Sequence, residues 1–331
     1  MKIAFIIGFP VTHTGHGVVS QAMTWKNGLE SLGHKVVLAD MWTPCDWKEF
    51  DVIQIFMYSE YAAEYIEAIA PVNPNIVLAP ILDPDFSIMA MRFVSGWGCS
   101  KLKLSNRYYR TSQVQHLVRC FFVRSDFEAL YVEKGWHVMK DRIFKVPLSF
   151  NYCAPFEGNR ENFCFHASFL ADDRKNVRRL IEAAKKYGFL LKLAGKLRNK
   201  EEVSKVNGWI DGARNIEYLG FLSQDNLIEM YKKARVFALP SIYEGVGIVA
   251  LDAAAMGCDV VLTNRGGPKE YYDGKASLVN PYSIDEIGKS IVKFLEGFTY
   301  QPQLQKHVLE RYSLDAVVKQ LIQGYEIVRR Q

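Results

Sequence analysis

Residues 243–256 read Y-E-G-V-G-I-V-A-L-D-A-A-A-M, and this stretch decides the fold class and the candidate site. Just upstream, residues 236–239 are all apolar and end at Pro240, which predicts a buried strand followed by a turn. The apolar run from Ile248 to Met256 predicts a helix. The order strand, polar turn, helix is the repeating unit of a parallel α/β sheet.

Two acids flank the start of this predicted helix. Glu244 stands in the turn and Asp252 lies inside the helix, about 10 Å away at a rise of about 1.5 Å per residue. Between them, the N–H groups at the helix start favour an anion, and Gly245 and Gly247, on either side of Val246, let a ligand approach the main chain. An anion between two carboxylates that accept hydroxyl groups fits a nucleotide-diphosphate sugar. The alternative is a surface helix with a solvated Glu and Asp.

The same alternation of strand and helix runs through the whole chain. Predicted strands cover 2–7, 35–39, 52–57, 75–79, 121–124, 143–146, 163–166, 190–193, 216–218, 236–239, 260–263 and 276–279. We therefore predict an α/β protein with two doubly wound (Rossmann-like) domains that face each other across a cleft, where a ligand binds at the carboxyl ends of the strands. The expected bounds are 1–149, 150–312 and a tail helix, 313–331, that crosses back to the first domain.

Composition narrows the class of protein. Of the 331 residues, 49% are apolar and 23% are charged, which is typical of a soluble globular protein. The start of the chain does not read as a secretory signal, and no apolar run approaches the roughly 20 residues of a membrane helix. Six cysteines without any Cys-x-x-Cys pair indicate free thiols in a reducing cytoplasm and argue against zinc. We expect a cytoplasmic protein.

The positive charge is concentrated in residues 92–124, which hold seven basic side chains and no acid, interleaved with aromatic residues. Such a segment suits peripheral contact with an anionic membrane. A solvated basic face is the simpler interpretation, and the two stay open. Nucleic acid is not expected, since no recognisable nucleic-acid module accompanies the charge.

Several ordered blocks in the second half resemble a known family. They read R-K-N-V-R-R-L-I-E-A (174–183), L-A-G (193–195), Y-L-G-F-L-S-Q-D-N-L (218–227), A-L-P-S-I-Y-E-G-V-G (238–247) and R-G-G-P-K-E-Y-Y (265–272). The region from about 163 to 281 is similar to the donor-binding domain of retaining glycosyltransferases with the GT-B architecture. That large family, the group 1 glycosyl transferases, includes sucrose synthases and many bacterial mannosyl- and glucosyltransferases. The first half resembles it more weakly.

The resemblance implies transfer of a hexose, with retention, from a nucleotide-diphosphate sugar to a carbohydrate or lipid-linked acceptor, with no metal or cofactor. It implies that Glu244 holds hydroxyls of the donor sugar and that Asp252 holds the ribose. The cations Lys175 and Arg174 would neutralise the diphosphate. The turn with Phe221 and Leu222 would cradle the base.

Three departures from the family pattern affect these roles. Asp252 stands where the family usually has the longer Glu. The first strand of the second domain is followed by H-A-S-F-L-A (166–171) and not by a glycine and the phosphate-binding Arg, so Arg174 is a candidate replacement. The family's catalytic His is also missing from A-P-I-L-D-P-D-F (79–86), where Asp83 or Asp85 is the candidate polar group.

Further candidates lie in the first half. Gly15 and Gly17 open a predicted helix and suit the approach of a phosphate or acceptor. His16 is either a catalytic, cleft-facing side chain or a plain turn residue. The Asp83-Pro84-Asp85 triplet resembles an Asp-x-Asp metal site, but we interpret it as a turn. Two rival functions remain, a nucleotide-sugar epimerase and a non-catalytic subunit that binds nucleotide sugars or glycans.

Overall fold

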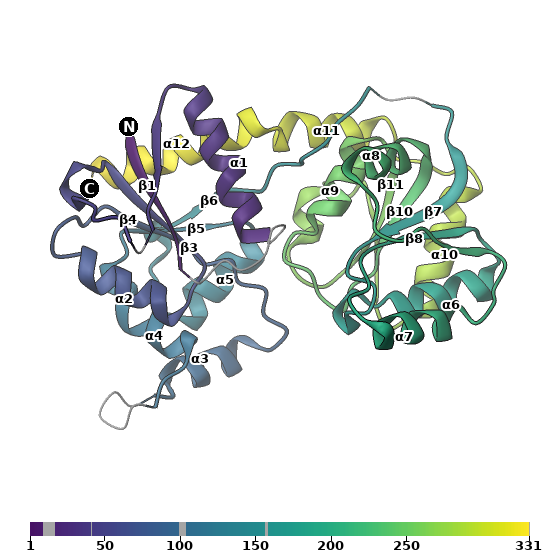
Figure 1. Cartoon of the computed structure of the whole chain (residues 1–331), viewed down its shortest axis with the longest axis horizontal. Helices are drawn as coiled ribbons and strands as arrows, with labels where there is room; N and C mark the ends of the chain where they lie inside the picture. Colours follow the sequence, from purple (N-terminus) through teal and green to yellow (C-terminus); the bar gives the residue numbers. More distant parts are fainter. Residues whose placement is uncertain (9–16, 41, 99–103, 156–157, 331) are drawn as a thin grey trace. The chain divides into compact units, whose positions relative to one another are not determined.

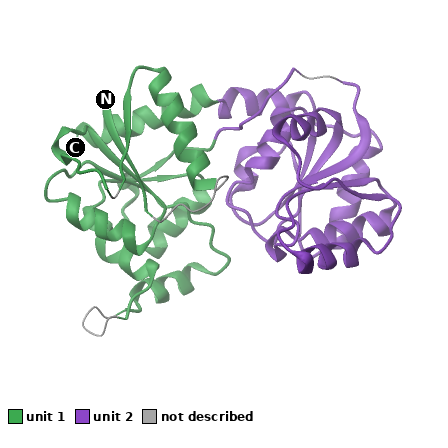
Figure 2. Ribbon diagram, in the orientation of Figure 1, with its two compact units in different colours: residues 1–148, 314–331 green, residues 149–313 purple. Residues whose placement is uncertain are grey.

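The chain folds into two compact units in the computed structural model, which describes residues 1–8, 17–40, 42–98, 104–155 and 158–330. Unit 1 contains residues 1–148 and 314–331, and unit 2 contains residues 149–313 (Figure 2). Each unit has one six-stranded sheet in which every pairing is parallel. The predicted α/β fold class is confirmed.

Unit 1 has the strand order β2-β1-β3-β4-β5-β6. Its strands are β1 (Lys2–Ile7), β2 (Lys35–Leu38), β3 (Val52–Phe56), β4 (Ile76–Ala79), β5 (Cys120–Val123) and β6 (Ile143–Lys145). Its helices are α1 (Gly17–Ser31), α2 (Glu60–Ile69), α3 (Ile88–Gly96), α4 (Arg107–Val114), α5 (Asp126–Gly135) and α12 (Leu314–Arg330). Figure 1 shows these helices around the sheet.

Both faces of the unit 1 sheet are covered, because side chains along a strand alternate between the faces. In β1, Ala4 and Ile6 join a core with α2, α4 and α5, whereas Ile3 and Phe5 join a second core with α1 and α12. The tail helix α12 therefore belongs to the core of unit 1, although its sequence follows unit 2.

Unit 2 has the strand order β12-β11-β10-β7-β8-β9. Its strands are β7 (Glu161–Ala167), β8 (Leu191–Ala194), β9 (Ile216–Tyr218), β10 (Ala234–Leu239), β11 (Asp259–Thr263) and β12 (Ser277–Val279). Its helices are α6 (Val177–Tyr187), α7 (Lys200–Ile210), α8 (Gln224–Lys233), α9 (Ile248–Ala255), α10 (Ile284–Leu295) and α11 (Gln303–Tyr312). Since β7 and β10 are neighbours, the loops that follow them lie at the same edge of the sheet.

The basic segment 92–124 is not one surface. It contains parts of α3, all of α4 and all of β5. Arg124 is buried, and Arg119 donates hydrogen bonds to Asn75 and to the carbonyl of Val328. These two cations therefore make contacts within unit 1. Only the rest of the segment can present charge to a partner.

None of the described helices is both long and apolar enough to cross a membrane.

Candidate functional site

Glu244 lies at the carboxyl edge of the unit 2 sheet, beside the start of α9. Strand β10 ends at Leu239, Pro240 follows, and the loop then leads to Gly247, the N-cap of α9. A Cβ added to Gly247 would lie 3.3 Å from Cγ of Glu244, so the Glu244 side chain passes close to the helix start. Gly247 has φ +76°, a left-handed conformation that favours glycine.

The main chain of Glu244 is held by the glycine pair after β11. Glu244 forms an isolated parallel bridge with Gly266, and Gly267 N donates to Glu244 O at 3.2 Å. A Cβ on Gly266, which has φ +94°, would stand 1.9 Å from Glu244 O. Only glycine at this position allows the two segments of main chain to come so close, so Gly266 fixes the position of Glu244.

Two cations contact the Glu244 carboxylate. Lys175 Nζ lies 3.0 Å from Oε1 and 3.1 Å from Oε2, and the two residues are only 9% and 8% exposed. Arg174 Nη1 is 3.8 Å from Oε1, and its guanidinium lies 5.5 Å from the centre of the Tyr243 ring. The main chains are joined as well, since Ile242 N donates to Arg174 O at 2.8 Å. The structure thus brings together Glu244, Lys175 and Arg174, which are 69 and 70 positions apart in the sequence.

This cluster carries positive charge beyond what Glu244 balances. A lysine ammonium has three donors, and Glu244 takes two of those on Lys175. Arg174 is half-buried and contributes a second positive charge, although its Nε also lies 3.9 Å from Asp172 Oδ2. Backbone N–H groups at the start of α9, where Gly245 and Val246 are buried and Ile248 is half-buried, have no partner inside the helix. An anion is the ligand that such a group of donors favours.

Asp252 differs from the open carboxylate expected beside the helix start. It is 2% exposed, and its Oδ1 accepts from Asn151 N at 2.5 Å and from Tyr152 N at 3.4 Å. Its Oδ2 accepts from Asn151 Nδ2 at 3.1 Å. Burial raises the pKa of Asp252 to about 6, although these hydrogen bonds oppose the shift. A ribose could reach this carboxylate only if Asn151 gave up its place, so that role stays a prediction.

His166 and Ser168 are polar neighbours at this edge that the sequence reasoning did not select. His166 Nδ1 is 2.7 Å from the carbonyl oxygen of Ala238, and Nε2 is 2.7 Å from Ser168 Oγ. Burial lowers the pKa of His166 to about 4, the Ala238 hydrogen bond opposes this, and the charge of Lys175 adds to the lowering. The ring is therefore neutral at pH 7, Nδ1 donates to Ala238, and Nε2 accepts from the Ser168 hydroxyl. The sequence signal that could have identified His166 is its position at the end of an apolar run, 163–166, that was predicted to be a strand.

Phe221 and Leu222 follow β9 at the same edge of the sheet. Gly220, with φ +73°, makes the turn, and its carbonyl accepts from Gly195 N at 2.9 Å. The Phe221 ring is 76% exposed, and Leu222 is half-buried. Phe169, which follows β7, is a second exposed ring at this edge. Exposed aromatic faces of this kind can stack on a planar base.

The predicted site residues of unit 1 have different surroundings from those of unit 2. Asp83 is exposed but accepts from Arg124 Nη2 at 2.7 Å, in an ion-pair group whose other members, Arg124 and Glu128, are buried, so its carboxylate is occupied by a structural contact. Asp83 and Asp85 lie in the loop between β4 and α3, and the chain bends at Asp85. Gly17 opens α1 and is exposed, with no atom within 4 Å of where a Cβ would be. Gly15 and His16 lie outside the described residues.

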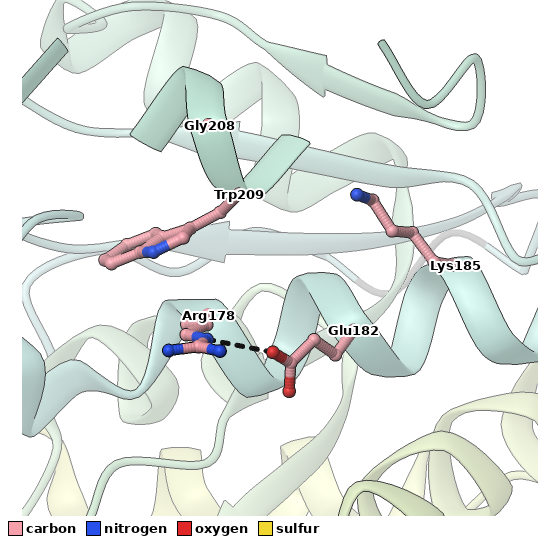
Figure 3. Close-up of a pocket in the computed structure, with 5 residues that line it drawn as sticks. All are labelled: Arg178, Glu182, Lys185, Gly208 and Trp209. Atoms are coloured by element: carbon pink, nitrogen blue, oxygen red, sulfur yellow. Dashed lines mark hydrogen bonds and ion pairs between the residues drawn. The ribbon is translucent and has the colours of Figure 1, made fainter. Parts of the chain in front are cut away.

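A surface hollow on unit 2 between α6 and α7 does not suit an anionic ligand. Its two adjoining parts measure about 510 and 410 Å³ and share Arg178, Glu182 and Trp209 (Figure 3). Arg178 pairs with Glu182 at 2.9 Å, and Lys205 pairs with Asp173 at 2.7 Å. Two of the cations that line the hollow are thus already paired with its acids, and the cluster around Glu244 remains the better candidate.

Comparison with solved structures identifies the fold. A sucrose-phosphate synthase from Thermosynechococcus elongatus matches with a TM-score of 0.74 at 15% identity, covering 99% of each chain. Alr3699/HepE from Anabaena, solved in complex with UDP and glucose, matches with a TM-score of 0.73 at 14% identity, covering 99% of this chain and 100% of that one. Two parallel α/β units with these matches define a protein of the GT-B fold class.

The sequence points to the same class of protein. Residues 157–308 match the model of the family "Glycosyl transferases group 1". An uncharacterized glycosyltransferase of Methanocaldococcus jannaschii is 34% identical over 118 residues, which are 34% of this chain and 30% of that protein. The chain spans less than half the length of the curated relatives it matches first. The resemblance predicted from the sequence is confirmed.

Proposed function

We propose that the protein transfers a hexose from a nucleotide-diphosphate sugar to a carbohydrate or lipid-linked acceptor, with retention of the anomeric configuration. The observation that carries this proposal is the group of Lys175, Arg174 and Glu244 beside the start of α9. It offers positive charge for a diphosphate and a carboxylate for sugar hydroxyls within a few ångströms of each other. The match of residues 157–308 to the group 1 family model supports the same reaction.

Lys175 and Arg174 hold the diphosphate in this proposal. Charge grows on the diphosphate as the bond to the sugar breaks, and fixed cations with helix-end amides stabilise charge that develops in the transition state. Lys175 keeps one donor for a phosphate oxygen while it holds Glu244 with the other two. Cations of the chain take the place that a metal ion has in other transferases, so no cofactor is proposed.

Glu244 and the loops around it hold the rest of the donor. With its carboxylate fixed by Lys175, Glu244 accepts hydrogen bonds from the sugar hydroxyls. The base lies against Phe221 and Leu222, and the ribose lies near Asp252 after Asn151 has been displaced. Gly245, Val246 and Gly247 bring the main chain close to the phosphates.

Unit 1 supplies the candidate residues for the acceptor side. His16, Gly15 and Gly17 remain the candidates there, with His16 as a catalytic group. Asp83 is a weaker catalytic candidate than the sequence implied, because Arg124 occupies its carboxylate. A cytoplasmic location, with the free thiols at positions 45, 120, 153, 164 and 258, belongs to the same proposal.

A product assay tests this function. The full chain is incubated with UDP-, GDP-, ADP- and dTDP-hexoses and a panel of glycan and lipid-linked acceptors, and release of the nucleoside diphosphate is measured. We expect acceptor-dependent release, with NMR showing the anomeric configuration of the donor in the product. Release of a changed nucleotide sugar without acceptor would indicate an epimerase. Binding without turnover under every acceptor would indicate a non-catalytic subunit, and either result would overturn the proposal.

A further inference from the structure

Helix α3 (Ile88–Gly96) in unit 1 has two different faces. Met91 on the inner face is fully buried in the core with α4 and α5. A Cβ on Gly135 of α5 would lie 2.5 Å from Met91 Sδ, so the glycine allows α5 to pack closely against α3. The inner face is therefore fixed to the unit, and the opposite face points away from it.

Three large apolar side chains lie on that outer face. Met89 and Phe93 lie four residues apart, on one side of the helix, and Trp97, the C-cap residue directly after the helix, follows at the same interval. They are 79%, 69% and 67% exposed. The rings of Phe93 and Trp97 stack with their centres 6.4 Å apart and their planes at 14°. Single exposed apolar residues are common, but a contiguous row of this kind marks an interaction surface.

Positive charge accompanies the row. Arg92 is exposed next to Phe93, and its Nε donates to the backbone carbonyl of Lys134. Among the described residues, no carboxylate pairs with Arg92 or with Arg107 at the start of α4, whose guanidinium lies over the rings of Tyr58 and Tyr108. Helix α3 itself contains no acid. An anionic partner therefore fits this surface better than a neutral or cationic one.

We propose that the outer face of α3 docks on an anionic lipid bilayer, with Met89, Phe93 and Trp97 inserted at the interface and Arg92 at the headgroups. Aromatic rings and basic side chains are the groups that favour the boundary between headgroups and acyl chains. With nine residues the helix is ~14 Å long, too short to span the roughly 30 Å of hydrocarbon, so it lies on the surface. This inference does not rest on the proposed function, because binding to lipid is measured without a donor.

The test is co-sedimentation of the full chain with vesicles of phosphatidylcholine, with and without phosphatidylglycerol, at low and high salt. We expect binding to the anionic vesicles that weakens at high salt. Phe93→Ser combined with Trp97→Ser should weaken it by about tenfold or more, since both rings leave the interface. Both positions are exposed, so thermal unfolding of the double variant should match that of the native chain.

Trp42→Ser is the matched control, because Trp42 in the same unit is 87% exposed and lies outside α3. This variant should bind vesicles as the native chain does. Three results would overturn the proposal: no binding to anionic vesicles, equal binding of the double variant, or equal binding to neutral and anionic vesicles. If the native chain instead forms dimers that the double variant cannot form, and neither binds vesicles, the face is a protein interface.

Discussion

Each unit holds a cation and carboxylate group at the carboxyl edge of its sheet, but the two groups differ in what they leave available. In unit 1, Arg124 is enclosed by Asp83 and Glu128 and also donates to the carbonyl of Leu82. In unit 2, Lys175 and Arg174 both contact the carboxylate of Glu244, and Arg174 also lies 3.9 Å from the half-exposed Asp172. One group has two acids for one buried cation, and the other has two cations for one buried acid.

The difference explains why similar residues build the fold in one unit and a candidate site in the other. Burial disfavours the charge on Arg124, but the carboxylates of Asp83 and Glu128 outweigh this and raise the pKa of Arg124. The positive charge of Arg124 is therefore neutralised within the fold, with one acid in excess. In unit 2, Asp172 is half-exposed and 3.9 Å from Arg174, so the cations beside the start of α9 keep donors that an anionic ligand can use.

The largest expected effect is a loss of stability when the ion-pair group of Arg124 in unit 1 is disrupted. Arg124→Met leaves Asp83 and Glu128 without their cation, and removing one partner of a buried ion pair costs about 3–5 kcal/mol. Urea unfolding of the full chain should show this loss. Arg110→Met is the control, because Arg110 pairs with Glu67 at 2.8 Å on the surface, where such pairs contribute about 0–1 kcal/mol. Equal losses for both variants would show that Arg124 is not a structural cation.

The next effect is on catalysis in unit 2. Lys175→Ala should lower kcat by about 10²–10³, since it removes a donor aimed at developing negative charge. Arg178→Ala is the control, because Arg178, in the first turn of α6 just after Lys175, is exposed and pairs with Glu182. The measurement is the rate of nucleoside diphosphate release with the reactive donor. A Lys175→Ala enzyme as fast as the control would remove Lys175 from the site.

The dependence of folding stability on pH distinguishes the buried Asp252 from an ordinary surface acid. Its pKa is about 6 in the folded chain, against an ordinary value of 3.8, so the folded state binds more protons than the unfolded state between these values. The contribution of Asp252 to stability is therefore fully present below about pH 4 and is lost as pH rises through 6. In Asp252→Asn this part of the decline should disappear.

The measurement is the free energy of unfolding in urea at pH 4.5 and at pH 7.5. Its fall between the two pH values is compared between the native chain and the Asp252→Asn variant. Other groups titrate equally in both proteins, so they cancel in this comparison. An identical fall in the free energy of unfolding for both proteins would contradict the burial of Asp252.

The smallest expected effect concerns the exposed ring of Phe221. If the base stacks there, Phe221→Ala should raise KM for the donor roughly fivefold, the lower end of what one aromatic contact to a base contributes. The value of kcat should be unchanged, because the ring is remote from the breaking bond. An unchanged KM would place the base elsewhere at this edge.

The sequence predicted the fold well because alternating apolar strands and amphipathic helices are local patterns. It also brought Glu244 together with Lys175 and Arg174, since the family blocks carry their order. Two contacts could not be predicted. Asn151, which covers Asp252, lies 101 positions away in a loop without periodicity. Arg124 stood in a basic segment that gave no sign of its burial beside Asp83.

The most direct test of the proposed donor site is the thermal stability of the full chain with nucleoside diphosphates and with the matching nucleotide sugars. Ligand at 100 times its dissociation constant adds about 2.7 kcal/mol, which corresponds to roughly 2–4 °C for a unit of this size. In Glu244→Gln, we predict that the gain from the bare nucleotide survives, because Lys175 keeps its charge, and that the extra gain from the sugar is lost. A variant that keeps both gains would contradict the placement of the donor sugar against Glu244.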